Sequence, residues 1–460
     1  MENKSQMLFS RKDLAKIIIP LVIQGILAIA ISMVDSIMVS SEGEAAFAGV
    51  SLVGSLDTLI VTLFSSLTSG GAVVLAQAMG QKDRDRACEG AKQLTYSTAI
   101  ISLVISIGIL AFRIPLLNAL FGDSEQSVMA NATAYFSILA LSYPFLAVEN
   151  SVFAIFRAQG DSMISLKVSL LKNLLNVGGN ALLIYWARMG ASGAALATLI
   201  SRVIGVFIAV WIARDSRRYI YLKNLFRFRP DFSIIRAILR IGIPNGIENS
   251  MFQFGRLMTS SLVSSLPTAA IAANSAALSL AGLQYSVNGA VQNTMVTVVG
   301  QCVGAREKKQ ARHYACSLTG VGYGLIFGAA SLLCLLSTPL LGLYNLSDEA
   351  FSLARIALFY HSAVSVLIYP LCFCLPAAFR AASDVRFTML VSIFSMWVFR
   401  VALAYFLAKN SISFFGLLTL PGLNLGLMGV WYAMTADWGC RAALFLWRFL
   451  SGKWLTKYRE

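Results

Sequence analysis

The sequence of residues 14–39, LAKIIIPLVIQGILAIAISMVDSIMV, is apolar over a length that exceeds the thickness of a lipid bilayer. A helix needs roughly 20 mainly apolar residues to cross the hydrocarbon core. Only Lys16 and Asp35 carry charge in this stretch. It is therefore predicted to be a membrane-spanning helix.

The rest of the chain repeats this pattern. The same criterion predicts twelve spanning helices, at residues 14–39, 46–77, 94–112, 130–156, 164–187, 190–213, 236–265, 269–300, 313–337, 351–379, 387–408 and 424–449. The strands of a membrane barrel are only about ten residues long. The runs therefore predict an all-α polytopic membrane protein without strands.

Composition agrees with a membrane protein. Hydrophobic residues make up 57% of the 460 residues and charged residues 13%, whereas soluble domains carry about 25% charged residues. The formal net charge of +15 lies in short clusters between apolar runs, which is typical of membrane topology rather than of nucleic-acid binding. The lipid bilayer is thus an expected partner and nucleic acid is not.

Basic residues are distributed unevenly when both termini are placed in the cytoplasm. The predicted outer loops hold only Arg113, Arg188, Arg355 and Lys409, and the inner loops hold basic clusters. Lysine and arginine accumulate on the cytoplasmic side of membrane proteins. We therefore expect a multi-pass protein of the cytoplasmic membrane with both termini inside.

The longest basic segment, at about residues 214–240, is predicted to be a cytoplasmic linker between two halves. Phenylalanine and arginine alternate within it at Phe226, Arg227, Phe228 and Arg229. Such interleaving suggests a helix that lies on the inner leaflet.

The two halves resemble each other. Pro20 matches Pro244 at an offset of 224 residues, and the same offset aligns Gln77 with Gln301. Six spans return the chain to the side on which it began, so the repeats run in parallel. This predicts two parallel six-helix lobes, residues 1–218 and 219–460. Alternating exposure of a shared cavity needs no catalytic group, so we expect a transporter and not an enzyme; the alternative is an old duplication in a static scaffold.

Asp35 is the sharpest candidate for a functional residue. It lies late in the first span among apolar neighbours, where an ionised carboxylate is costly unless it is paired, hydrated or protonated. A carboxylate that takes a proton or meets a cation is what a coupled exporter needs. The alternatives are a helix-packing hydrogen bond or an interfacial position near Ser40.

The fifth span carries a polar face. Asn173, Asn176 and Asn180 are spaced by three and four residues and so share one side of a helix. Opposite Asp35, this face would form a proton or sodium site. The alternative is that the three amides hold helices together.

The seventh span also carries polar groups. Glu248 and Arg256 lie about two turns apart on one face, and Gln253 lies between them. Such a face is expected to line a cavity or to contact another span. Cation coupling and a structural network both explain it. Apolar candidates for a cavity wall that binds organic cations are Met33 and Met38 in the first span, and Phe252 and Met258 in the seventh.

Pro20 and Pro244 lie at matching places in the first and seventh spans. Proline frees a carbonyl and bends a helix, so both are predicted hinges. The chain contains no Gly-x-x-x-x-Gly-Lys-Ser/Thr loop for ATP. His313 and His361 have no metal-ligand partner at helical spacing, and neither a metal nor another cofactor is expected.

The chain resembles the multidrug and toxic compound extrusion family over nearly its full length. The resemblance rests on Pro20 with Val34–Val39, on the Gln77–Gly80 segment before a basic loop, on Phe156–Asp161, on Asn176 and on Met189–Ala195, with copies in the second half. It implies an exporter of organic cations that takes up protons or sodium in exchange. The family's first-span aspartate and fifth-span asparagine match Asp35 and Asn176.

Two positions depart from the family pattern. Some members carry an aspartate where this chain has Asn180, and some carry a seventh-span glutamate where this chain has Phe252, with Glu248 one turn earlier. The second-lobe sodium site of those members is therefore not implied. Proton exchange at Asp35 is the simpler expectation.

The leading hypothesis is an antiporter that exports amphipathic organic cations, such as drugs, in exchange for protons, acting as a monomer. The alternatives are a sodium-coupled drug exporter, a flippase for lipid-linked precursors from a related two-lobe class, and a scaffold that transports nothing. The flippase class would show a strongly basic cavity and often extra spans.

Overall fold

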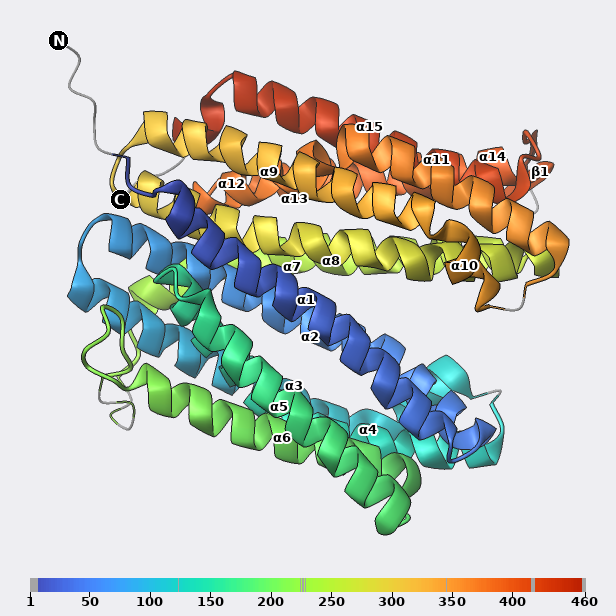
Figure 1. The fold of residues 1–460 in the computed structure, drawn as a ribbon, viewed down its shortest axis with the longest axis horizontal. Helices are drawn as coiled ribbons and strands as arrows, with labels where there is room; N and C mark the ends of the chain where they lie inside the picture. The colour runs from blue at the N-terminus through green and yellow to red at the C-terminus, as the bar shows by residue number, and fades with distance from the viewer. Residues whose placement is uncertain are drawn as a thin grey trace. The chain divides into compact units, whose positions relative to one another are not determined.

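A computed structural model describes residues 7–122, 124–223, 225, 227, 229–344, 346–414 and 418–456, and nearly all of them are helical (Figure 1). The chain separates into two compact units. The first unit runs up to Gly246 and includes Gly304–Arg306, and the second unit holds Ile247–Val303 and the chain from Glu307 onward. The boundary predicted between residues 218 and 219 stays a prediction.

Each predicted span of the first half is helical. The helices are α1 (Arg11–Ser40), α2 (Glu44–Gly80), α3 (Arg84–Phe121), α4 (Gln126–Ala158), α5 (Ser162–Asn180) and α6 (Gly190–Ala213). A π-helical segment, η1 (Ala181–Trp186), continues α5. The first helix starts at a capping box, because the Ser10 hydroxyl accepts from the Asp13 amide and the Asp13 carboxylate accepts from the Ser10 amide.

The second half contains the remaining six predicted spans. Its helices are α7 (Phe232–Ser264), α8 (Thr268–Gly304), α9 (Lys308–Leu335), the short α10 (Ser337–Gly342), α11 (Asp348–Phe373), α12 (Leu375–Ala381), α13 (Val385–Ser395), α14 (Leu403–Ala408) and α15 (Gly426–Leu450), followed by a 3-10 turn, η3 (Lys453–Thr456). The π-helical segment η2 (Met396–Ala402) joins α13 to α14. The tenth predicted span is divided between α11 and α12, with Pro376 in the first turn of α12.

A small hairpin departs from the predicted absence of strands. Strands β1 (Ser411–Phe414) and β2 (Leu418–Pro421) pair antiparallel between α14 and α15, with Ser411 opposite Pro421. Isoleucine, phenylalanine and threonine favour strands, but each run is only four residues long. The runs are too short to stand out beside the long apolar helices.

Eight helical segments among the described residues are long and apolar enough by themselves to cross a membrane. They include α1 to α4 and α6 in the first half, and α9, α11 with α12, and α13 to α14 in the second. The helices α5, α7, α8 and α15 fall outside this group. In α5 the two lysines and three asparagines interrupt the apolar sequence, and these helices carry many of the polar residues considered below.

The backbone repeats between the halves. Lys82 and Arg306, which follow the ends of α2 and α8, have φ angles of 60° and 62°. Non-glycine residues rarely adopt positive φ, and these two residues lie 224 positions apart. The predicted internal repeat is therefore confirmed in local conformation as well as in sequence.

Close helix contact holds the first unit together. A Cβ atom on Gly49 of α2 would lie 2.9 Å from the Ala132 nitrogen and 2.9 Å from the Val128 oxygen of α4. Small residues allow such backbone approach in membrane helices. Beside this contact, Phe64 and Phe136 are buried in one apolar cluster, and together these contacts fix α2 and α4 as two walls of the cavity described below.

The linker after α6 contains no helix among its described residues. Arg227 and Arg229 lie in non-helical segments, and Phe226 and Phe228 lie outside the described residues, so the predicted surface helix is not found. The polar backbone of the segment is satisfied by side chains of other helices instead.

Arg84, in the first turn of α3, fastens this linker to the first unit. Its Nη2 donates to the carbonyl oxygens of Ser216 and Arg218 at 2.9 Å each, and its Nε donates to that of Tyr219 at 3.0 Å. Gln159 also exchanges two hydrogen bonds with the Ile220 backbone, at 3.0 and 3.1 Å. A basic segment that resembles a free tether in sequence is thus an anchored part of the first unit.

Candidate functional site

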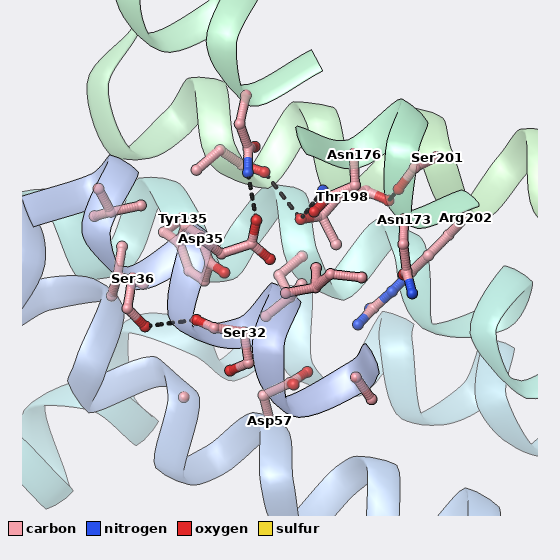
Figure 2. Close-up of a pocket in the computed structure, with 18 of the residues that line it drawn as sticks. Ser32, Asp35, Ser36, Asp57, Tyr135, Asn173, Asn176, Thr198, Ser201 and Arg202 are labelled. Carbon is pink, nitrogen blue, oxygen red and sulfur yellow. Dashed lines mark hydrogen bonds between the residues drawn. The ribbon is translucent and has the colours of Figure 1, made fainter. Parts of the chain in front are cut away.

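A polar cavity of about 450 Å³ lies within the first unit (Figure 2). Helices α1, α2, α4, α5 and α6 all contribute to its lining. Pockets that hold drug-sized molecules measure roughly 300–1,000 Å³. The cavity is therefore large enough for a small organic solute, and its walls mix apolar side chains such as Ile31 and Phe47 with polar ones.

Asp35 of α1 faces this cavity and accepts hydrogen bonds from α5. Asn180 Nδ2 donates to Asp35 Oδ1 at 2.7 Å. The Asn176 side-chain amide is oriented with its nitrogen toward Asp35, because both its nitrogen and its oxygen then have hydrogen-bond partners. The nitrogen donates to Asp35 Oδ1 at 3.0 Å and to Oδ2 at 3.1 Å, and the oxygen accepts from Thr198 Oγ1 at 3.2 Å. The fifth-span asparagines and the first-span aspartate are thus brought together as one cluster.

Asp35 has no basic partner among the described residues. The two basic side chains that line the cavity are engaged elsewhere: Lys172 Nζ lies 2.8 Å from Glu149 Oε2, and Arg202 Nη1 donates to Ser142 Oγ at 2.6 Å. Amide donors alone therefore surround the Asp35 carboxylate. Such a group gains a proton or a cation more readily than a carboxylate that is already paired with arginine or lysine.

A second carboxylate lines the same cavity. The structure places Asp57, a residue of the second predicted span, on the α2 wall (Figure 2). Its Oδ1 is buried and has no hydrogen-bond partner in the described chain. Asp57 therefore adds a second carboxylate to the cavity lining.

Sequence reasoning missed three further residues of the site. Lys172, Arg202 and Thr198 all line the cavity, but none was singled out. A usable signal existed in α6, where Thr198, Ser201 and Arg202 are spaced by three and four residues within an otherwise apolar helix.

The two methionines of α1 lie apart from this cavity lining. Met38 is 8% exposed and packs in a small apolar cluster with Ile184 and Ala194. Met33 is 61% exposed. Contact of either methionine with a substrate stays a prediction.

The polar face of α7 belongs in part to the second unit. Glu248 Oε1 accepts from Ser392 Oγ at 2.8 Å, and Arg256 Nη1 donates to Gln253 Oε1 at 3.4 Å. Met258 is 42% exposed. Gln253 thus contacts Arg256, whereas the substrate-binding role of this face stays a prediction.

Phe252 lies between two arginines. The guanidinium carbons of Arg400 and Arg441 lie 5.2 and 5.4 Å from the centre of its ring, within the range of cation–π attraction. Arg441 Nε donates to Asp437 Oδ1 at 2.8 Å, an ion pair between residues one helical turn apart on α15. Phe252 thus packs inside a charged cluster of the second unit.

Both predicted hinge prolines lie inside continuous helices. Pro20 interrupts α1 and Pro244 interrupts α7. The described residues contain no group of three His, Cys, Asp or Glu side chains that could hold a metal ion. Bending at the prolines and the absence of a cofactor stay predictions.

A family model described as MatE matches the chain twice, at residues 20–182 and 244–406. The two matched segments are related by the same offset of 224 that the sequence repeat shows. The chain is also 24% identical over 458 residues to the "Probable multidrug resistance protein NorM" of Thermotoga maritima, covering 96% of this chain and 93% of that protein. It is 23% identical over 446 residues to the "Uncharacterized transporter YisQ" of Bacillus subtilis, covering 95% and 94%.

Solved structures agree with the fold. One is the outward-facing conformation of a multidrug resistance MATE family transporter, with a TM-score of 0.85, 20% identity and 97% of each chain covered. Another is a MATE protein in a bent conformation, with a TM-score of 0.86, 21% identity, and 97% and 96% covered. At these identities the structures establish the shared fold.

Proposed function

This chain belongs to the MatE family of multi-pass membrane transporters, and from that premise we propose that it exports amphipathic organic cations in exchange for protons by alternating access. The observation that carries this proposal is the cluster at Asp35. Its carboxylate faces a 450 Å³ cavity, is held by Asn180, and lacks a basic partner in the described chain.

The exchange follows from competition for one carboxylate. When Asp35 is ionised, its negative charge attracts a cationic solute in a medium of low dielectric constant. When a proton binds, that attraction disappears and the solute leaves. Asn176 and Asn180 hold the carboxylate in place in both states, because an amide also presents an oxygen that can accept from a protonated acid.

Sodium is the second candidate for the coupling ion. Asn180 Oδ1 is buried and has no hydrogen-bond donor in the described chain. Hard cations prefer carboxylate and amide oxygens, and Asp35 and Asn180 present both. Proton exchange is preferred because it requires only the carboxylate.

Location and assembly complete the proposal. We place the protein in the cytoplasmic membrane with both termini in the cytoplasm, because the basic residues accumulate on that side. The cavity forms within a single chain, so a monomer suffices for transport.

The test is efflux of a fluorescent organic cation from proteoliposomes under an imposed pH gradient or an imposed sodium gradient. We expect the pH gradient to drive efflux, Asp35→Asn to abolish it, and Asp348→Asn, outside the cavity in the first turn of α11, to retain it. Full gradient-driven efflux by Asp35→Asn would refute the coupling role. Efflux that only the sodium gradient drives would identify sodium, and not the proton, as the coupling ion.

A further inference from the structure

A second, much smaller cavity lies within the second unit. It measures about 30 Å³ and lies between α7, α8, η2 and α15, with Thr259, Ser260, Asn274, Arg400 and Trp431 among its lining residues. A cavity needs roughly 10–15 Å³ of this volume to hold one water molecule. It is therefore too small for an organic solute and large enough for a small ion.

This cavity is the counterpart of the Asp35 cavity in the other repeat. The offset of 224 between the starts of the two MatE segments takes Asp35 to Thr259, whereas the offset of 223 between the starts of α5 and α13 takes Asn176 to Phe399, next to Arg400. The offset of 224 takes four further lining residues of the first cavity to lining residues of the second: Ser36 to Ser260, Val39 to Val263, Val50 to Asn274 and Gly54 to Leu278. The two sites thus share a position in the repeat, and they differ in charge, because a carboxylate has become a hydroxyl and a guanidinium, that of Arg400, lines the second cavity.

The polar groups of the second cavity are hydrogen-bond donors. Trp431 Nε1 donates to Asn274 Oδ1 at 3.2 Å. Because an indole N–H can only donate, the Asn274 oxygen faces Trp431, and the Asn274 NH2 group remains available to donate to a ligand. The Asn274 NH2 group and the Ser260 hydroxyl have no hydrogen-bond partner among the described residues, and no acidic residue lines the cavity.

Arg400 shares its nearest acid, Asp437, with a second arginine, Arg441. Arg400 is 8% exposed, and its Nη1 lies 3.7 Å from Asp437 Oδ2, beyond hydrogen-bond distance. Asp437 is already bound by Arg441 at 2.8 Å and by Ser395 Oγ at 2.7 Å through Oδ1. No hydrogen bond from the Arg400 guanidinium is found in the described chain, and a buried charge without one is costly.

The other acid of this region, Glu248, is hydrogen-bonded through Oε1 and has a buried Oε2 without a hydrogen-bond partner in the described chain. Glu248 accepts from Ser392, whose backbone oxygen in turn accepts from Arg441 at 3.2 Å. Glu248 therefore lies on the Arg441 side of the cluster and does not line the cavity. Arg256, which contacts Gln253, adds a further positive charge to the second unit.

We propose that this cavity binds one small monovalent anion of halide size, held by Arg400, Asn274 and Ser260. Asp437 carries one negative charge for two arginines, Arg400 and Arg441, and the anion balances the second positive charge. The anion also accepts hydrogen bonds from donors that have no partner among the described residues. The first repeat would then hold its cation or proton, and the second repeat an anion, at equivalent positions. The site stands independently of the transported solute and of the coupling ion.

The direct test uses bromide, which chloride-sized sites accept, and full-length protein. Crystals grown in bromide are expected to show an anomalous peak beside Arg400. In lipid nanodiscs, the unfolding temperature is expected to rise with chloride to a plateau when gluconate is replaced at constant ionic strength. The variant Arg400→Asn, which removes the guanidinium, is expected to weaken the chloride effect roughly tenfold or more, because a charge-assisted hydrogen bond is lost.

A second variant covers the case in which Arg400→Asn does not fold. Thr259→Asp restores the carboxylate of the first repeat beside Arg400, so this tethered negative charge is expected to replace the anion and to abolish the chloride effect. Arg355→Gln is the matched control, since Arg355 also lies over an aromatic ring, that of Phe359, but outside the cavity. Absence of the bromide peak, or a chloride effect that persists unchanged in Thr259→Asp, would show that only water fills the cavity and would overturn the proposal.

Discussion

Asn180 donates its side-chain amide to Asp35 at 2.7 Å across 145 residues of sequence. A donated hydrogen bond favours the ionised form of a carboxylate. In Asn180→Leu this donor is lost, so Asp35 is expected to keep its proton up to a higher pH. The half-maximal pH of proton-driven transport should rise by roughly one unit, the equivalent of about 1.4 kcal/mol.

The comparison for this shift is Asn173→Leu. Asn173 lines the same cavity from the same helix but makes no hydrogen bond to Asp35 in the described chain. A pH profile of efflux that moves equally in both variants would argue against a specific role for the Asn180 amide.

The ion pair between Lys172 and Glu149 predicts a large loss of stability when one partner is removed. The Glu149 side chain is 1% exposed and that of Lys172 is 18% exposed. Lys172→Met leaves a buried carboxylate without its partner, which costs about 3–5 kcal/mol. The double variant Lys172→Met, Glu149→Gln is expected to recover most of this loss. Thermal unfolding in detergent measures both, and an equal loss in the two variants would contradict the pairing.

The contact between α2 and α4 predicts that Gly49→Ala destabilises the protein. The added Cβ would meet backbone atoms of Ala132 and Val128 at 2.9 Å, and forced overpacking costs about 1–3 kcal/mol. Gly108→Ala on α3 is the control, since a Cβ added there would have no atom of another described residue within 4 Å beyond its own helical turn. A lower unfolding temperature is expected for Gly49→Ala alone.

The three hydrogen bonds from Arg84 predict that the linker is released when this side chain is removed. Arg84→Ala frees the carbonyls of Ser216, Arg218 and Tyr219, and trypsin is then expected to cut within residues 214–229 several times faster. Arg84→Lys should not restore protection, because a single ammonium cannot reproduce the guanidinium geometry.

The control for this cleavage is Arg86→Ala on the same helix. Arg86 donates to Gln81 at 3.5 Å and not to the linker. Equal cleavage rates in the wild type and in Arg84→Ala would show that the linker is held by other contacts.

Several features of the fold and site were predictable because they depend on local sequence. Apolar length predicts most of the spanning helices, eight of which are long and apolar enough by themselves among the described residues, and the spacing of Asn176 and Asn180 determines a shared helix face. The cost of burying a carboxylate singled out Asp35 without any knowledge of its neighbours. The repeat offset followed from matching residues alone.

Other features depend on how each helix is rotated about its axis, which local sequence does not determine. Lys172 reaches Glu149 and Arg202 reaches Ser142 only because α4, α5 and α6 pack in one orientation. The anchoring of the linker by Arg84 likewise depends on contacts more than 130 residues apart. The hairpin was missed because its strands are very short.

The positions of Asn180 and Arg400 depend on the number of residues in the π-helical segments η1 and η2. Asn180 directly precedes η1, and Arg400 lies within η2. A π-helical turn holds more residues than an α-helical turn, so deleting a residue of η2 before Arg400 would let the segment close into an α-helix. Arg400 would then lie on another face of the helix although no cavity residue had been substituted. Evolution of these two segments is therefore expected to tolerate exchange of side chains and to reject insertions and deletions.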